Sequence, residues 1–507
     1  MNLAHIIDRH AADSAALIFD GDSITYGELR DEVGRMRGGL ASIGVAKGDR
    51  VALLLGNSRQ FVVAYLATIG LGAVAVPLNP YSPGPELELQ LTTVGATVVL
   101  VGEVGAASWS NVDRQQIPFV MHVISDAPNA FDEQTVGDLD ELLAGEPVAC
   151  LDVDPDDIAV HMFTSGTAGS PKAAMLSHGN LASNIQQSNS ADGHVDADDV
   201  IYGVLPLFHI FGLNVVVGVG LSAGAAIVLA TRFEPSAAVT SIRDNAVTVV
   251  PGAPAIWAAF SQLDELEPDA FAAVRLALSG ASRLPVSVAR SMSERFGVAI
   301  REGYGLTETS PIVCTSVGIT PRFGSVGRVL DGVEVRLVND NGEALIGDVG
   351  EVWVRGDNVF LGYYNDPDAT AAVLTEDGWL KTGDMATVDD DGYLYLVDRS
   401  KDLIIVAGFN VYPAEVEEVL AMHAAVRETA VVGVPNDPTG EAVKAFVVAT
   451  AGAEISEAML IEHALVHLAS YKCPTQVVFV DQLPRNATGK IIRRNLDAAS
   501  VVGPATQ

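Results

Sequence analysis

The first half of the chain alternates short, fully apolar runs with segments whose apolar residues recur at helical spacing. The apolar runs comprise residues 50–55, 73–78, 96–101, 225–230 and 246–252. Runs of this kind are typical of strands buried on both faces of a sheet. Residues 58–72 have helical spacing, and Thr25 with Glu28 forms a capping-box pattern that predicts a helix start. The alternation predicts an α/β fold with parallel sheets covered by helices on both faces.

The pattern changes near Gly324. Apolar and polar residues alternate in 324–340, 350–356 and 392–400, with Asn-Gly and Asp-Gly turns between strands. We expect antiparallel strands there, in a small barrel-like or sandwich subdomain. About a hundred residues after Lys401 form a compact segment of mixed helices and strands. The short charged connection before this segment is either a hinge or an ordinary loop.

One apolar run, Leu213–Ala230, approaches the length of a membrane span. It contains Asn214, Ser222 and several glycines, and no comparable run flanks it. We therefore predict a buried helix that leads into a buried strand, and no transmembrane segment.

Composition narrows the function classes. The 507 residues, 49% apolar and 19% charged, are enough for two or three domains with a large core. The 64 acidic residues against 30 Lys plus Arg argue against nucleic-acid binding and against docking on anionic lipid. An anionic ligand would need local hydrogen-bond donors to overcome this charge.

Three cysteines, Cys150, Cys314 and Cys473, fit neither a metal site nor a disulfide framework. The first residues carry charge early and lack the layout of a signal peptide. Both observations favour a reducing, cytoplasmic location.

The segment His161–His178 has the components of a phosphate-binding loop. An apolar strand-like run is followed by small hydroxyl residues and glycines, and Lys172 closes the segment. Gly166 and Gly169 free the backbone to turn, so that successive N–H groups can form an anion nest. The pattern of the kinase and ATPase P-loop is absent. A flexible Gly/Ser loop is the alternative for this segment alone.

Further short motifs follow in order along the chain. They are SGASRLP from Ser279, GYGLTET from Gly303, TGD from Thr382, DRSKD from Asp398, GFNVYPAEVE from Gly408 and PRNATGK from Pro484. With these motifs the chain resembles the adenylate-forming superfamily, which includes acyl-CoA synthetases, 4-coumarate–CoA ligases, luciferases and peptide-synthetase adenylation domains. The resemblance implies an adenylation domain over 1–398, a hinge at 399–401 and a mobile C-terminal domain over 402–507.

The resemblance also implies a two-step reaction. A carboxylate attacks the α-phosphate of ATP to give acyl-AMP, and a thiol, usually that of coenzyme A, then displaces AMP. The loop for the departing phosphates would comprise Thr164, Ser165, Gly166, Thr167, Gly169 and Lys172. Ala168 departs from the family pattern, because a hydroxyl or acidic residue is expected there.

The remaining nucleotide contacts follow from the other motifs. The adenine slot would be lined by Gly280, Ala281, Gly303, Tyr304 and Gly305. Thr307 would donate to the α-phosphate, and Glu308 is a hard oxygen ligand suited to Mg²⁺. Asp384 and Arg399 would bind the ribose hydroxyls.

Lys490 would stabilise the charge that develops between the substrate carboxylate and the α-phosphate. Lys401 occupies the family's hinge position. Gly408 would leave room for the pantetheine arm of coenzyme A.

The acid is indicated by the motif PLFHIFGL, in which His209 would contact the carboxylate or gate the pocket; a structural, hydrogen-bonded histidine is the alternative. No acidic residue lies between Leu205 and Arg232 to pair with an α-amino group, and Trp257 adds apolar lining. We therefore expect a hydrophobic carboxylic acid, with a fatty acid favoured and an aryl acid possible.

Two other functions stay open: an acyl-AMP ligase that loads a carrier protein, and a non-catalytic paralogue that binds nucleotide or acyl ligand. The expected partners are small molecules and, for the ligase alternative, that carrier protein. The sequence does not indicate an oligomeric state.

Overall fold

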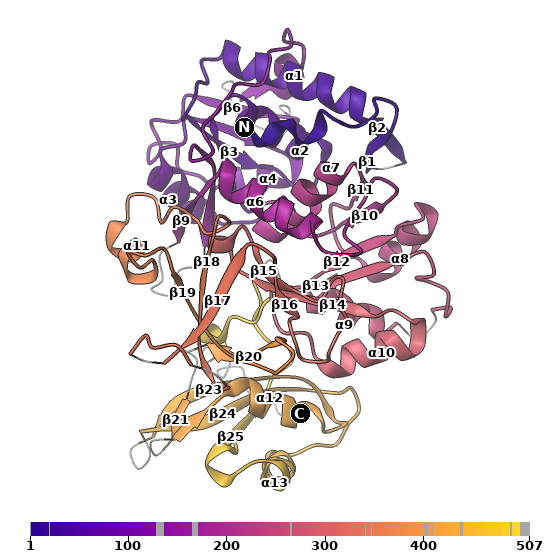
Figure 1. Cartoon of the computed structure of the whole chain (residues 1–507), viewed down its shortest axis with the longest axis vertical. Coiled ribbons are helices and arrows are strands. Elements are labelled where there is room, and N and C mark those ends of the chain that lie inside the picture. Colours follow the sequence, from indigo (N-terminus) through magenta and orange to yellow (C-terminus); the bar gives the residue numbers. More distant parts are fainter. Residues whose placement is uncertain are drawn as a thin grey trace. The chain divides into compact units, whose positions relative to one another are not determined.

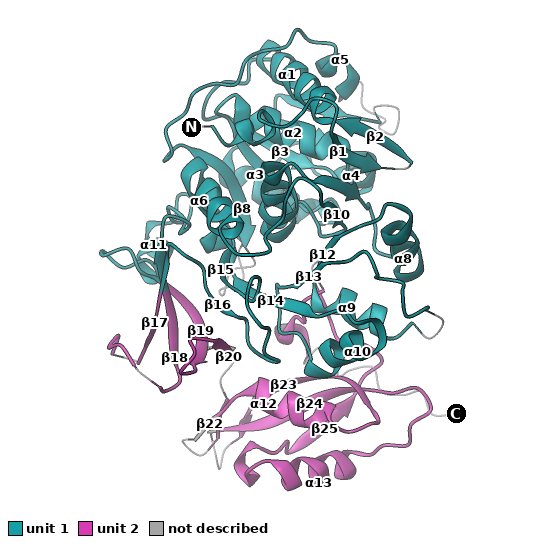
Figure 2. Cartoon of the chain, turned by 45° about the vertical axis from the view of Figure 1, so that its right-hand side comes forward, with its two compact units in different colours: residues 1–334, 354–380 teal, residues 335–353, 381–507 magenta. Residues whose placement is uncertain are grey.

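The computed structural model in Figure 1 describes most of the chain. The described residues are 2–19, 21–127, 136–164, 171–263, 266–339, 341–345, 347–399, 404–406, 409–436, 440–486 and 489–496. The chain forms two compact units, coloured separately in Figure 2. Unit 1 comprises residues 1–334 and 354–380, and unit 2 comprises residues 335–353 and 381–507.

Unit 1 contains a seven-stranded sheet in the order β7-β6-β5-β3-β4-β8-β9. Its strands are β3 (Arg50–Leu54), β4 (Val74–Pro77), β5 (Val98–Val101), β6 (His122–Ser125), β7 (Val136–Asp138), β8 (Ile158–Thr164) and β9 (Lys172–Ser177). All neighbours pair in parallel except β8 and β9, which form an antiparallel pair. Strands β3, β4 and β5 are apolar apart from Arg50, as the sequence predicts for strands covered on both faces, whereas β6 and β7 contain polar residues.

A nine-stranded sheet follows the order β16-β15-β14-β13-β12-β10-β11-β1-β2. Its strands are β1 (Ala15–Phe19), β2 (Asp22–Thr25), β10 (Val200–Gly203), β11 (Ala226–Leu229), β12 (Val249–Gly252), β13 (Leu276–Ser279), β14 (Ile300–Gly305), β15 (Ile312–Thr315) and β16 (Arg328–Val329). The central strands are parallel, but the sheet ends in antiparallel pairs at both edges. The sequence pattern did not predict these antiparallel edges.

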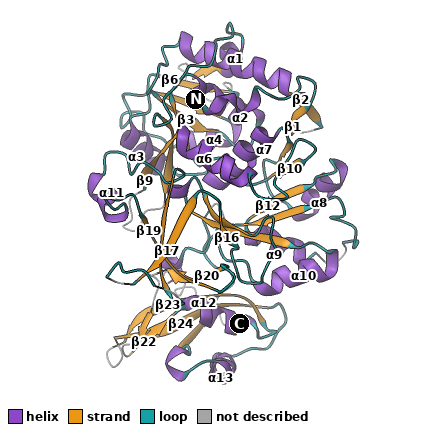
Figure 3. Cartoon of the chain, in the orientation of Figure 1, coloured by secondary structure: helices purple, strands orange, loops and turns teal. Residues whose placement is uncertain are grey.

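Helices of unit 1 are distributed along the sheets (Figure 3). They are η1 (Leu3–Ile7), α1 (Tyr26–Ser42), α2 (Arg59–Gly70), α3 (Gly84–Val94), α4 (Glu103–Trp109), α5 (Leu139–Leu143), α6 (His178–Asn189), α7 (Gly220–Ala223), α8 (Pro235–Asp244), α9 (Pro254–Ser261), α10 (Val286–Phe296) and α11 (Pro367–Val373). The predicted capping box is confirmed, because the Thr25 side chain accepts from the Glu28 N–H and Glu28 accepts from the Thr25 N–H.

The long apolar run is a buried helical segment followed by a buried strand, as predicted. Its first part is a π-helix, η3 (Phe211–Val219), whose residues after Phe211 are all buried. The run then continues through α7 into β11. Among the described residues, no helix is long and apolar enough to cross a membrane.

The second part of the chain is rich in antiparallel strands. A four-stranded sheet has the order β17-β18-β19-β20, with β17 at Val333–Val338, β18 at Gly350–Gly356, β19 at Leu380–Val388 and β20 at Leu394–Arg399. A five-stranded sheet of unit 2 contains β21 (Ile404–Val406), β22 (Phe409–Val411), β23 (Val426–Asn436), β24 (Gly440–Ala449) and β25 (Gln476–Phe479). Helices α12 (Pro413–Ala421) and α13 (Glu457–His467) belong to the same region. The expected fold class is confirmed, whereas the domain limits with a hinge at 399–401 stay a prediction.

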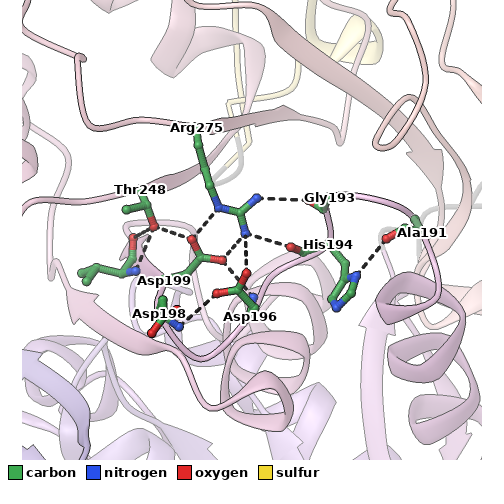
Figure 4. A network of polar contacts seen from close by, with 9 residues as sticks. Ala191, Gly193, His194, Asp196, Asp198, Asp199, Thr248 and Arg275 are labelled. Atoms are coloured by element: carbon green, nitrogen blue, oxygen red, sulfur yellow. Dashed lines mark hydrogen bonds and ion pairs between the residues drawn. The ribbon is translucent and has the colours of Figure 1, made fainter.

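A polar network fastens one end of three neighbouring parallel strands (Figure 4). Asp199, Thr248 and Arg275 each precede a strand directly: β10, β12 and β13. Arg275 donates from Nε to Asp199 Oδ1 at 2.7 Å and also from Nη2 to Asp199 Oδ2, and Thr248 donates to Asp199 Oδ1 at 2.7 Å. Burial acts to raise the pKa of Asp199, but these hydrogen bonds and the guanidinium charge outweigh it and hold the pKa below its usual range.

Replacement of Arg275 should therefore destabilise unit 1 in a pH-dependent way. Arg275→Met leaves the Asp199 carboxylate buried without its charged partner, and we expect a loss of about 2–4 kcal/mol in the free energy of unfolding at pH 7. Because the folded-state pKa of Asp199 is depressed, this stabilisation is present above the unfolded pKa of roughly 3.9 and is lost as the pH falls further. Urea denaturation of the wild type and of Arg275→Met from pH 7 to pH 3 measures the difference in the free energy of unfolding.

Arg35→Met is the matched control, because Arg35 pairs with Asp31 on an exposed helix surface. Exposed pairs of this kind contribute little. A loss in Arg275→Met that does not shrink at low pH would contradict the assignment of the stabilisation to the Asp199 carboxylate.

Candidate functional site

The predicted nucleotide motifs of unit 1 lie at the carboxyl ends of parallel strands. Thr164 ends β8, Gly280 directly follows β13, and Thr307 comes two residues after β14. In open α/β sheets this edge is where ligands bind. The fold therefore gives these three segments the position that a binding site requires.

The phosphate-loop motif is framed by the β8–β9 hairpin. Thr164 and Lys172 are register partners at the end of this antiparallel pair. The sequence led us to expect Lys172 in a loop, but it is the first residue of β9, so strand pairing fixes its backbone. Four predicted phosphate-loop residues, Ser165, Gly166, Thr167 and Gly169, lie outside the described residues, as does Ala168.

Residues 361–364 pair with β9 and bring Tyr363 beside Lys172. Tyr363 forms an antiparallel bridge with Ala174, and the Tyr364 N–H donates to the Ala173 carbonyl at 2.8 Å. The Lys172 Nζ atom lies 5.2 Å from the centroid of the Tyr363 ring, and 3.7 Å from Asp366 Oδ2. The lysine is therefore held over an aromatic face, an arrangement that favours a cation.

The same tyrosine binds the predicted metal ligand. The Tyr363 hydroxyl donates to Glu308 Oε1 at 2.7 Å, and the Phe360 N–H donates to the Glu308 carbonyl at 2.9 Å. Burial, together with the adjacent Glu308 carboxylate, raises the pKa of Tyr363 well above its usual range, so the phenol stays protonated. The structure thus brings Lys172 and Glu308, predicted from separate motifs, to opposite parts of one side chain. No spacing signal in the sequence indicated Tyr363.

The loop that carries Thr307 and Glu308 is held by three buried asparagines. Asn184 of α6 donates to the Ile312 carbonyl at 2.8 Å and accepts the Ile312 N–H at 3.0 Å. Asn214 of η3 donates to the Ser310 carbonyl at 2.6 Å. Asn358 donates to the Thr309 carbonyl at 2.9 Å. These bonds satisfy backbone groups that burial would otherwise leave without partners, and they fix the loop.

The chemistry of Glu308 fits Mg²⁺ that arrives with a nucleotide. Glu308 is half-buried at the second position of the 3₁₀ turn Thr307–Thr309, and its Oε1 atom already accepts the Tyr363 hydroxyl. Within the described part of the chain, no group of three His, Cys, Asp or Glu side chains gathers into a metal cage. Mg²⁺ in phosphate-handling sites typically binds one or two carboxylates together with the substrate phosphates. The residues present fit that arrangement.

The adenine motifs have tight backbone geometry. A Cβ atom on Gly280 would lie 3.1 Å from Cε1 of Phe211, so this glycine packs against the first residue of η3. A Cβ atom on Gly305 would lie 1.9 Å from the Pro311 carbonyl oxygen. The sequence suggested that Gly305 makes room for a nucleotide, but the β14–β15 turn itself already requires glycine. Ala281 has a positive φ of 69°, and Tyr304 is buried.

The substrate motif leads into the π-helix. His209 is half-buried, and its Nδ1 accepts the Phe211 N–H at 3.2 Å, which satisfies a donor at the helix start. His209 therefore has a hydrogen bond of the kind expected for a structural histidine. Its contact with the substrate carboxylate stays a prediction. Trp257 is completely buried in the main core, and its indole donates to the Leu278 carbonyl at 3.0 Å.

In unit 2 the two predicted ribose ligands are register partners. Asp384 of β19 stands directly opposite Arg399 of β20. The Asp384 N–H donates to Thr382 Oγ1 at 3.1 Å, and the Thr382 hydroxyl donates to the Val352 carbonyl at 2.7 Å. The TGD motif is thereby anchored to the neighbouring strand.

Lys490 lies in a hairpin closed by its own motif. The Lys490 N–H donates to Asn486 Oδ1 at 2.9 Å, and the Asn486 N–H donates to the Lys490 carbonyl at 2.9 Å. This pairing holds the lysine backbone, and the side chain is half-buried. Lys401 and Gly408 lie outside the described residues.

Comparison with known proteins gives the family. The model of the AMP-binding enzyme family matches residues 3–364, which is more than half of the chain, and the model of the AMP-binding enzyme C-terminal domain matches residues 415–490. The chain belongs to the AMP-binding enzyme family. The expected membership of the adenylate-forming superfamily is confirmed.

Characterised relatives of this AMP-binding enzyme extend over nearly its full length. It is 34% identical to 4-coumarate–CoA ligase 3 of Oryza sativa subsp. japonica, covering 95% of this chain and 88% of the relative. It is 35% identical to a long-chain-fatty-acid–CoA ligase of Yersinia pestis, covering 96% of this chain and 91% of the relative. The crystal structure of ATP-bound MatB from Rhodopseudomonas palustris matches with a TM-score of 0.91 and 34% identity, over 99% of each chain.

The AMP-binding enzyme is accordingly an AMP-forming acyl- or aryl-CoA ligase, with ATP, Mg²⁺ and coenzyme A as the expected cofactors. The expectation of a catalytic protein is thus confirmed over the non-catalytic alternative. The roles of the individual residues stay predictions.

The turn after β14 offers a matched pair of glycine variants. Gly305→Ala would place Cβ 1.9 Å from a backbone oxygen, whereas in Gly303→Ala the nearest atom, the Cys314 carbonyl oxygen, would be 3.2 Å away. We expect Gly305→Ala to lower the free energy of unfolding by about 3 kcal/mol or more, because backbone must shift, and Gly303→Ala to lower it by much less. Chemical denaturation of both variants measures the difference. Equal losses would show that the turn accommodates a side chain at 305.

Proposed function

We propose that this AMP-binding enzyme is an acyl-CoA synthetase that activates a hydrophobic carboxylic acid, with fatty acids as the favoured class. The observation that carries this proposal is the composition of the substrate motif. Between Leu205 and Arg232 the chain has no acidic residue, and the π-helix within this stretch is apolar and buried except for Phe211 at its start. The single polar side chain of the π-helix, Asn214, donates to backbone carbonyls of Leu181 and Ser310.

This composition disfavours an amino-acid substrate. An α-ammonium group needs a carboxylate partner in a buried site, because an unpaired buried charge is strongly unfavourable. An alkyl or aryl group requires no such partner and is stabilised by apolar surface. The fatty-acid and 4-coumarate relatives are consistent with both kinds of group, so the choice between them rests on experiment.

The proposed division of labour follows the motifs. The phosphate loop with Lys172 binds the β- and γ-phosphates, and Thr307 donates to the α-phosphate. Glu308 holds Mg²⁺, which supplies charge neutralisation at the phosphates. Supporting evidence is the position of Thr164 and Thr307 at the carboxyl ends of strands β8 and β14, and the contact of Lys172 and Glu308 with one tyrosine.

The remaining roles belong to the second part of the chain. We propose that Asp384 and Arg399 bind the ribose and that Lys490 stabilises the adenylation transition state. Rotation at a hinge at 399–401 then removes Lys490 from the active site and brings in the segment that contains Gly408. The small glycine leaves room for the thiol of coenzyme A. We also propose a cytoplasmic location, in keeping with the free cysteines Cys150, Cys314 and Cys473.

A panel of acids tests the substrate class. The purified protein is incubated with ATP, Mg²⁺ and saturated fatty acids of increasing length, 4-coumarate, benzoate and amino acids, with and without coenzyme A. We expect AMP and acyl-CoA from fatty acids, with product formed only when coenzyme A is present. Turnover restricted to aryl acids would replace the fatty-acid assignment. Acyl-AMP that accumulates despite coenzyme A would point to a carrier-protein acceptor instead.

Lys490→Ala separates the two half-reactions. We expect a loss of about 10²–10³-fold in acyl-AMP formation, because a charge-stabilising group is removed, with little change in thioester formation from supplied acyl-AMP. Lys444→Ala is the matched control, because Lys444 lies over the Phe446 ring in β24 of the same unit. Equal losses in both half-reactions would refute the role assigned to Lys490.

A further inference from the structure

Tyr363 contacts both nucleotide motifs of unit 1, at Lys172 and at Glu308. Its backbone is bridged to Ala174 of β9, and its N–H donates to Thr370 Oγ1 at 2.9 Å. Its ring meets the Phe360 ring edge to face, with centroids 5.0 Å apart. The ring is therefore held from the backbone and from one side by packing, and its hydroxyl is a fixed point.

The predicted metal ligand and the predicted phosphate-binding lysine both contact the Tyr363 side chain. The hydroxyl donates to Glu308 Oε1 at 2.7 Å, and the ring face lies 5.2 Å from the Lys172 ammonium. A glutamate has three side-chain torsions, and the hydrogen bond to Glu308 Oε1 restricts rotation of the carboxylate. The ring face gives the lysine a favourable position on the same scaffold.

We propose that Tyr363 is a positioning residue that orients the Glu308 carboxylate for the metal that accompanies ATP. The same side chain also positions the phosphate-binding Lys172 relative to Glu308. The inference rests on the proposed function, since Glu308 and Lys172 take their roles from it. In this proposal Tyr363 acts through Glu308, to which its hydroxyl donates. Partners that orient a metal ligand in this way commonly contribute 10–100-fold to metal affinity.

Tyr363→Phe isolates the hydroxyl, because it keeps the ring, its packing and the contact with Lys172. Binding of a non-hydrolysable ATP analogue is measured by titration calorimetry with and without Mg²⁺, which requires no turnover. In the wild type Mg²⁺ should increase analogue affinity. In Tyr363→Phe this increase should be at least tenfold smaller, while affinity without Mg²⁺ stays unchanged.

Kinetics provide the second readout. The concentration of Mg²⁺ that gives half-maximal acyl-AMP formation should rise by about tenfold in Tyr363→Phe. High Mg²⁺ should restore the rate, and the KM for the acid should stay constant. Damage to the fold would not be rescued by Mg²⁺.

Tyr364→Phe is the matched control. The ring of this adjacent tyrosine lies tilted against His161, with ring centroids 4.6 Å apart. Tyr364→Phe keeps that ring and removes a hydroxyl from the neighbouring position. An unchanged Mg²⁺ effect in Tyr363→Phe, or an equal change in Tyr364→Phe, would overturn the proposal. Glu308→Gln distinguishes failure of the proposed function from failure of this inference. If Glu308→Gln also keeps the Mg²⁺ effect, the assignment of Glu308 as metal ligand is wrong. If only Glu308→Gln loses the Mg²⁺ effect, the role of Tyr363 alone is rejected.

Discussion

The candidate site depends on hydrogen bonds to one buried stretch of backbone, residues 309–312. Buried peptide groups need partners, and this stretch cannot obtain all of them from the sheet. Three asparagines supply the missing partners. Asn184 lies in α6, Asn214 lies in the π-helix, and Asn358 lies in the segment that leads to Tyr363. Three parts of the chain, far apart in sequence, thereby converge on one loop. The position of Thr307 and Glu308 is a consequence of this convergence.

The acidic composition of the chain makes nucleotide binding depend on local groups. The chain carries a formal net charge of −34, which opposes the approach of a nucleotide. In the proposed function, binding therefore relies on local groups, namely the backbone N–H groups of the phosphate loop, the Lys172 ammonium and a metal at Glu308. The Tyr363 side chain contacts both Lys172 and Glu308, because its ring lies beside the ammonium and its hydroxyl donates to one carboxylate oxygen. The overall acidity is then compatible with an anionic substrate.

The sequence predicted features that leave a local signal. Apolar runs identified five of the parallel strands (β3, β4, β5, β11 and β12), the Thr25–Glu28 spacing identified the start of α1, and ordered motifs identified the family. The π-helix was predicted only as a helix, because it is apolar all round apart from Asn214, so no hydrophobic period distinguishes it from an α-helix. Tyr363 and the three asparagines were missed because their contacts are long-range: Asn184 and Ile312 are 128 residues apart. The steric demand at Gly305 comes from the Pro311 carbonyl, which only the folded turn places there.

Acid-dependent exchange of labelled pyrophosphate into ATP tests the central claim most directly, because it reports reversible attack of a carboxylate on the α-phosphate without any thiol. We expect exchange that requires both Mg²⁺ and a hydrophobic carboxylic acid and that proceeds without coenzyme A. Exchange that is independent of the acid, or release of ADP in place of AMP, would contradict this claim.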